Sequence, residues 1–150
     1  MTDWTAAELL ISVPVAEDEQ AAALSRLGAG LSALDAGGLA EVWVDHDPFP
    51  ALCALINGPR GWLMFIRYSG DAGFSSRNPE YDGAADSEIE YRLGNGQRDL
   101  YPASWAYPRD VLFEALRHFA RTRTVPPGIN WANDSGDGRS SPNDPFEQPV

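Results

Sequence analysis

The chain of 150 residues has no lysine, a single cysteine and only two histidines. The lone cysteine, Cys53, has no internal partner for a disulfide, and its place in an apolar run favours a small buried side chain over a nucleophile. No apolar run exceeds about seven residues, which is far short of a membrane span, and residues 1–4 are acidic rather than basic. These absences argue against a disulfide framework, membrane insertion and export, so we expect a cytoplasmic protein.

Charge of one sign dominates the chain. Twenty-two acidic residues stand against eleven basic ones, all arginine, and the net charge is −11. An acidic surface repels the phosphates of nucleic acids, and it speeds encounters with a basic partner through long-range attraction. The alternative is that the acidity only keeps the protein in solution. We therefore expect no nucleic-acid or membrane partner, and we keep a basic protein partner as a hypothesis.

Residues 51–68 predict a hairpin of two apolar strands. The runs 51–57 and 62–68 flank a turn at 58–61 that contains glycine and proline, the two residue types that end strands. In the second run both alternating sets of side chains are apolar, so both of its faces must be covered. We therefore predict that residues 62–68 form a central strand.

A second hairpin is predicted over residues 88–101. Charged and apolar residues alternate from Glu88 to Leu93, so this strand buries only one face. The turn Gly94-Asn95-Gly96 supplies the residue types that tolerate positive φ angles in a tight hairpin.

Two amphipathic helices are also predicted. Leucines recur at three- and four-residue spacing from Leu24 to Leu34, and a second apolar stripe runs from Val111 to Phe119 behind Pro108. Further strands are predicted over residues 8–13, 39–45 and near 129–131. This order predicts an α+β fold, with a mainly antiparallel sheet of about five to seven strands and two helices packed on one face.

One domain fits the length and the hydrophobic content of 43%. We expect residues 1–132 to form a single α+β domain. Beyond it, only Phe146 and Val150 are large and apolar, too little to offset the entropy of ordering the segment. We therefore predict a disordered acidic and polar tail over residues 133–150.

Four motifs occur in order along the chain: Gly58-Pro-Arg-Gly-Trp-Leu-Met64, Gly70-Asp-Ala-Gly-Phe-Ser-Ser-Arg-Asn-Pro-Glu-Tyr81, Glu90-Tyr-Arg-Leu-Gly-Asn-Gly-Gln97 and Tyr101-Pro-Ala-Ser-Trp105. Together they resemble immunity protein family one of bacterial polymorphic toxin systems, especially its actinobacterial members, over about residues 39 to 131. The lack of lysine is typical of a high-GC genome and agrees with that source. The resemblance implies a small α+β antitoxin encoded beside a secreted toxin, often a nucleic-acid or nucleotide deaminase, and it implies no catalytic residues.

The strongest catalytic candidate is Asp45-His46-Asp47, because carboxylates beside an imidazole at a strand end can bind a metal or orient a general base. The alternative is a loop that leads into Pro48. The only other histidine is His118, and no H-x-x-x-H, C-x-x-C or nucleophile motif completes a site. We therefore expect no catalytic residue, no metal and no cofactor.

The loop from Ser69 to Ser87 is the better functional candidate, because its nineteen residues exceed ordinary connection lengths. Aromatic rings spaced among charged residues suit a protein interface. The alternative is that these rings only hold the loop against its own domain. The predicted partner-binding residues of this loop and the adjoining strand are Asp71, Phe74, Arg77, Glu80, Tyr81, Asp82, Glu88 and Glu90.

The sequence thus predicts an immunity protein without chemistry of its own. It would bind a basic cognate toxin, such as a deaminase or another toxin that acts on nucleic acids, and occlude its active site or substrate groove. Two alternatives stay open: a small acid–base or metal-dependent enzyme that uses Asp45, His46 and Asp47, and a binding module for another basic protein.

Overall fold

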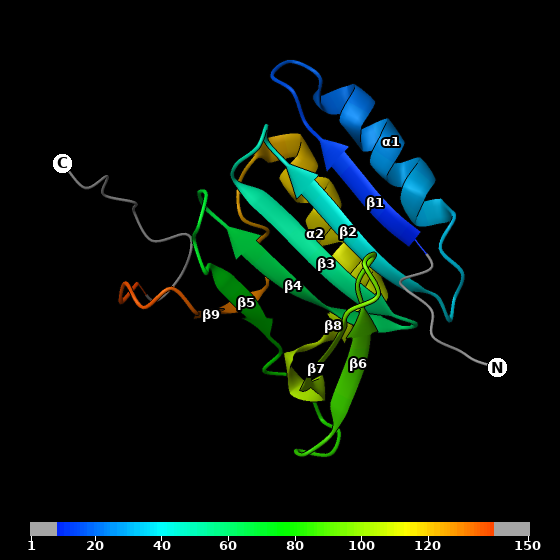
Figure 1. Cartoon of the computed structure of the whole chain (residues 1–150), viewed down its shortest axis with the longest axis vertical. Coiled ribbons are helices and arrows are strands. Elements are labelled where there is room, and N and C mark those ends of the chain that lie inside the picture. The colour runs from blue at the N-terminus through cyan, green and yellow to red at the C-terminus, as the bar shows by residue number, and fades with distance from the viewer. Residues whose placement is uncertain (1–8, 140–150) are drawn as a thin grey trace.

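A computed structural model describes residues 9–139 of the chain, as an open α+β fold with two helices and a mostly antiparallel seven-stranded sheet (Figure 1). Strands pair in the order β1-β2-β3-β4-β5-β9, and β8 pairs with the start of β4. The strands of this sheet are β1 (Leu9–Pro14), β2 (Leu39–Asp45), β3 (Ala51–Asn57), β4 (Arg60–Ile66), β5 (Phe74–Arg77), β8 (Tyr107–Pro108) and β9 (Asn130–Asn133). The predicted fold class and the central position of β4 are confirmed.

Helix α1 (Gln20–Ser32) connects β1 to β2. These two strands pair in parallel, and a parallel pair needs a crossover connection of this kind. Helix α2 (Arg109–Thr122) follows β8, and Arg123 ends it with a left-handed φ of 66°. Both helices pack on the same face of the sheet (Figure 1). The predicted helix layer on one face is therefore confirmed.

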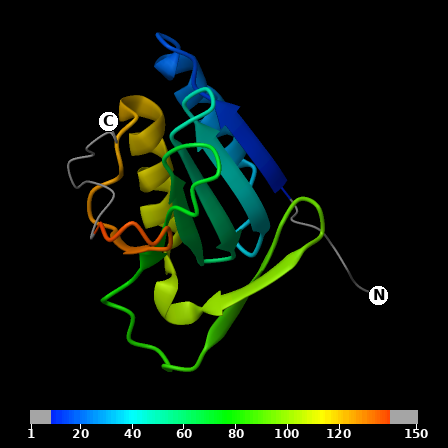
Figure 2. The ribbon, with the colours of Figure 1, turned by 60° about the vertical axis from the view of Figure 1, so that its left-hand side comes forward.

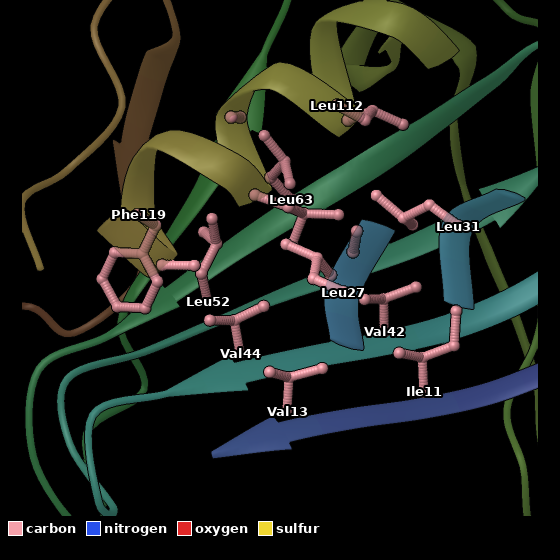
Figure 3. Close-up of a cluster of buried hydrophobic side chains, with 14 of the residues drawn as sticks. Ile11, Val13, Leu27, Leu31, Val42, Val44, Leu52, Leu63, Leu112 and Phe119 are labelled. Atoms are coloured by element: carbon pink, nitrogen blue, oxygen red, sulfur yellow. The ribbon is translucent and has the colours of Figure 1, made fainter. Parts of the chain in front are cut away.

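The main core lies between the helices and this face of the sheet. Leu27 of α1 and Phe119 of α2 are fully buried against Val42 of β2 and Leu52 of β3 (Figure 3). Fully burying side chains of this size contributes about 1.5–3 kcal/mol each, so this layer supplies much of the stability.

The opposite face of β3 and β4 has a core of its own. Cys53, Leu55 and Trp62 point away from the helices and are buried together with Tyr91 of β6 (Glu88–Arg92). Burial also raises the pKa of the Cys53 thiol well above its ordinary value, which agrees with a small buried side chain. Both faces of the central hairpin are covered, as the apolar character of its two alternating sets predicts.

The cover on this second face is a separate two-stranded sheet of β6 (Glu88–Arg92) and β7 (Arg98–Pro102), here called the arm. Figure 2 shows the arm against the face of the sheet opposite α2. The sequence suggested that this hairpin continues the main sheet. It does not. A hairpin that packs on a sheet and a hairpin that pairs within a sheet can each bury a single face, so both show the same alternation of apolar and polar residues in the sequence.

The predicted long loop differs from the structure. The predicted loop from Ser69 to Ser87 contains strand β5, whose short sequence Phe-Ser-Ser-Arg has no apolar alternation to mark it. The strand β9 includes Asn133, one residue beyond the predicted domain end at residue 132. The next residue also contacts the domain, since the Asp134 N–H donates to Gly73 O at 2.8 Å. Residues 140–150 of the predicted tail lie outside the described residues.

Two glycines offer a matched test of this packing. A Cβ on Gly61 would meet the backbone oxygen of Leu55 and lie 2.7 Å from Leu112 Cδ1, whereas a Cβ on Gly28 in α1 would meet nothing within 4 Å. We predict that Gly61→Ala lowers the free energy of unfolding by about 2 kcal/mol or more through overpacking. Gly28→Ala should raise it by about 0.5–1 kcal/mol, because alanine loses less entropy in a helix. Urea unfolding of both variants measures this, and equal effects would contradict the close approach of α2 to β3 and β4.

Candidate functional site

Residues 78–88, here called the acidic segment, run from the end of β5 to Glu88, the first residue of the arm. Backbone bonds hold both ends: Asn78 N–H donates to Ser104 O at 3.0 Å, and Ala103 N–H donates to Ser87 O at 2.8 Å. The side-chain amide of Asn78 also donates to Ala106 O at 2.9 Å. The segment is thereby anchored against the turn η1 (Ala103–Trp105) at the base of the arm.

Four exposed carboxylates belong to this segment: Glu80, Asp82, Asp86 and Glu88. None of them forms an ion pair with another described residue. No basic residue occurs between residues 78 and 91. Tyr81 is half-buried, and its hydroxyl donates to Ala84 O at 2.8 Å within the segment. The carboxylates therefore form an uncompensated negative surface beside the arm.

Two of the predicted partner-binding residues lie elsewhere. Asp71 belongs to the turn between β4 and β5, at the end of β4 that lies away from the arm (Figure 1). Its side chain has no exposed area, and its carboxylate accepts bonds from Arg67 Nε at 2.8 Å and Arg67 Nη2 at 2.9 Å. Phe74 is fully buried, with the Arg67 guanidinium 4.9 Å from its ring centroid. Neither side chain offers surface to a partner in this conformation.

Burial alone would raise the pKa of Asp71, but hydrogen bonds from Arg67 and from Gly73 N–H hold it below its ordinary value. Arg67 also pairs with Asp137 at 2.6 Å, so this ion pair joins the β4–β5 turn to the segment after β9. The ion pairs of Arg67 with Asp71 and Asp137 therefore stabilise the edge of the sheet.

Arg77 contacts η1 at the base of the arm. Its guanidinium lies 3.5 Å from the centroid of the Trp105 ring, and burial lowers its pKa. Trp105 stacks on Tyr101 of β7 at 5.8 Å, and Tyr101 stacks on Trp62 of β4 at 4.6 Å. This ladder of rings connects β5, η1, β7 and β4, and stacked pairs of this kind contribute about 0.5–1.5 kcal/mol each beyond area burial. Arg77 thus acts through the position of the arm.

The outer face of the arm carries the remaining predicted residues. Glu88 is exposed, while Glu90 pairs with Arg92 at 3.0 Å and with Arg98 at 3.8 Å. Leu100, directly opposite Glu90, is 59% exposed. The sequence prediction missed Leu100, although counting the register outward from the Gly94–Gly96 turn would have placed it on this face.

The triplet Asp45-His46-Asp47 ends β2 and enters a loop. His46 Nε2 lies 2.7 Å from Phe119 O, and because a carbonyl only accepts, this nitrogen carries the proton and donates. Burial lowers the pKa of His46, although the bond to Phe119 opposes that shift. The Asp45 carboxylate accepts the Asp47 N–H at 3.1 Å. Over residues 9–139 no group of three or more histidine, cysteine or acidic side chains could hold a metal ion.

An apolar hollow of about 220 Å³ lies between α2 and residues 126–129. Glu114 and His118 are its titratable lining residues, and the ring of His118 is engaged with Thr124 Oγ1 at 3.0 Å. It lies on the helix side and has too few convergent polar groups to define a reaction site.

The exposed carboxylates beside the arm form a surface whose charge would complement a basic protein. The chain belongs to the Imm1 immunity protein family, whose model, described as Immunity protein Imm1, matches residues 4–133. The match extends the predicted resemblance of residues 39 to 131 in both directions and confirms it at the level of the family. Comparison with curated proteins found no match. No helix in the described part of the chain is long and apolar enough to cross a membrane.

The structural role of Asp71 can be tested apart from binding. We predict that Asp71→Asn lowers the free energy of unfolding at pH 7 by about 2 kcal/mol, because the largely buried Arg67 loses the carboxylate that accepts two of its hydrogen bonds and keeps only Asp137 as a charged partner. The folded-state pKa of Asp71 is depressed, so its contribution is present above the unfolded pKa of about 4 and is lost as the pH falls through the folded value. The difference from the wild-type protein should therefore shrink at pH 3.

Urea unfolding at pH 7 and pH 3 measures both effects. Asp47→Asn is the matched control, because this exposed carboxylate makes no ion pair with a described residue and should change little at either pH. Equal stabilities of Asp71→Asn and wild type at pH 7 would contradict the role of the Arg67 pair.

Proposed function

We propose that this protein is a cytoplasmic immunity protein that binds a cognate polymorphic toxin and neutralises it by stoichiometric occlusion. Membership of the Imm1 family supports toxin immunity and a role as an inhibitor rather than an enzyme. The single observation that supports the binding surface is the acidic segment, whose four exposed carboxylates form no ion pair within residues 9–139. Protection requires tight binding, and nanomolar affinity corresponds to about −12 kcal/mol, which an interface of ~1,600 Å² can supply.

The toxin in this proposal acts on nucleic acid, as a deaminase does, and therefore presents a basic substrate groove. Such a groove attracts phosphates, and a carboxylate surface of the same shape competes for it. The charge distribution of the chain agrees with a basic partner that binds at the acidic segment rather than at the helices. Residues 78–91 carry five carboxylates and no arginine, whereas residues 109–123 on the helix side carry four arginines and two carboxylates.

The proposed surface consists of Glu80, Tyr81, Asp82 and Glu88, with Glu90 and Arg77 supporting it from within the arm and beneath it. Asp71 and Phe74 remain untested as predicted contacts, but a partner would reach them only after the β4–β5 turn opened, because neither side chain is exposed.

Charge reversal tests this surface. We predict that the triple variant Glu80→Lys, Asp82→Lys and Glu88→Lys weakens toxin affinity by about tenfold to hundredfold at low salt, chiefly through a slower association rate. Surface plasmon resonance against the purified toxin domain, at 50 and 300 mM salt, measures the effect, and the loss should shrink at the higher salt.

The matched control is Glu17→Lys, Asp35→Lys and Glu114→Lys. It changes the net charge by the same amount, but at exposed positions on α2 and on either side of α1. An equal loss in both triple variants would indicate that only the overall charge matters and would remove the acidic segment from the interface.

His46→Ala separates the inhibitor from the enzyme alternative. We predict that this variant still inhibits the toxin at a one-to-one ratio, while its free energy of unfolding falls by about 1–2 kcal/mol with loss of the bond to Phe119 O and the edge contact with the Phe119 ring. Toxin titration and urea unfolding give the two readouts. Loss of inhibition by a folded His46→Ala protein would favour a reaction that uses Asp45, His46 and Asp47.

A binding module for another basic protein remains the alternative from a third class. Salt-sensitive association with a partner that has no toxic activity, combined with failure to protect cells from the neighbouring toxin, would favour it.

A further inference from the structure

The outer edge of β7, in the arm, is not paired with any other described strand. Its sheet consists of β6 and β7 alone, and β6 is the strand that packs toward β2 and β3. Strand β7 pairs with β6 alone, and it contacts the main sheet through the ring of Tyr101 on Trp62. An unpaired edge exposes backbone donors and acceptors, which makes it a template for one more strand.

The register shows which residue of β7 faces that edge. Leu93 N–H donates to Gln97 O at 2.9 Å, and Ala103 N–H donates to Ser87 O at 2.8 Å. Hydrogen-bonded pairs recur at every second residue of an antiparallel ladder, so Asp99 and Tyr101 direct their backbone groups toward β6. The N–H and C=O of Leu100 therefore point outward. The other strand shows the same alternation, since Glu90 O faces away from β7 and accepts from Asn57 Nδ2 at 2.8 Å.

The side chain of Leu100 is the second unusual feature of this strand. It is 59% exposed and is one of three exposed large hydrophobic residues in the described part of the chain. It lies on the outer face of the arm, directly opposite Glu90 and diagonal to Glu88. A single apolar side chain within a polar rim matches the layout of a protein interface, where a rim excludes water from an apolar centre.

The edge is held rigidly in place. The ladder of Trp62, Tyr101 and Trp105 supports β7, and Gly94 N–H donates to Glu41 Oε1 at 2.7 Å at the tip of the arm. A strand that is already ordered loses little entropy when it binds, so the binding free energy is not offset by folding of the site.

We propose that the cognate toxin adds an extended, basic segment to the outer edge of β7, as a third strand of the arm, with Leu100 as the apolar anchor. This inference rests on the proposed immunity function and specifies the mode of recognition. Backbone pairing would supply affinity, Leu100 and its neighbours would supply selectivity, and the acidic segment beside the edge would attract the basic residues of the added strand. A second copy of this chain fits the edge less well, because each copy carries a net charge of −11.

The side-chain part is tested with Leu100→Ala against Tyr68→Ala. Tyr68 is also an exposed large hydrophobic residue, at 46%, but it follows the end of β4 that lies away from the arm (Figure 1). Leu10 is not used as the control, because its side chain lies near Gly94 in the turn of the arm. Isothermal titration calorimetry with the purified toxin domain should show about thirtyfold weaker binding for Leu100→Ala. Tyr68→Ala should bind within about twofold of wild type.

The backbone part is tested by amide exchange in the wild-type complex. In the free protein the Leu100 amide should exchange faster than those of Asp99 and Tyr101, and binding of the toxin domain should protect it strongly. Leu100→Pro gives a second readout, because proline is tolerated at an outward N–H of an edge strand. It should bind roughly fivefold more weakly than Leu100→Ala, the size expected for one lost hydrogen bond.

Unchanged affinity of Leu100→Ala, or an unprotected Leu100 amide in the complex, would overturn the proposal. So would a wild-type dimer that dissociates on Leu100→Ala, since the edge would then bind a second copy. In those cases the wild-type protein would still inhibit the toxin and the immunity function would stand. Failure of the wild-type protein to inhibit the neighbouring toxin would instead remove the immunity function itself.

Discussion

The hairpin of β3 and β4 has apolar side chains on both faces, and the need to cover both determines the rest of the fold. Leu52 and Leu63 on one face require the helix layer, while Leu55 and Trp62 on the other require the arm. A sheet that was covered on one side only would leave these large side chains in water. The arm is thus first a structural part, and its inner face is occupied by packing.

The two faces of the arm have different roles because side chains alternate between the faces of a strand with a period of two residues. Tyr91 and Tyr101 face inward and hold the arm to β3 and β4, so Glu88 and Leu100 must face outward. The same alternation places one set of backbone groups against β6 and leaves the other at the open edge. A rigid inner face and an available outer face are therefore two consequences of one backbone geometry, which suits a protein whose task is to bind without rearrangement.

The acidity of the chain has different roles in different places. Asp71 and Asp137 neutralise Arg67 and stabilise the edge of the sheet, and Glu41 fixes the tip of the arm. The carboxylates of the acidic segment have no such partner within the described protein. Net charge alone would not separate these two groups, whereas burial and pairing do.

The sequence by itself determined the element types, the central place of β4, the helix layer and the outward direction of Glu88, because each depends on a local period of apolar residues. It also carried the motifs of the Imm1 family. Only the tertiary structure decided that the arm packs on the sheet rather than extending it, that β5 interrupts the long loop, that Asp71 and Phe74 are buried and that Leu100 is exposed. These outcomes depend on which distant segments meet, and contacts between residues far apart in the chain leave no period in the sequence that could reveal them.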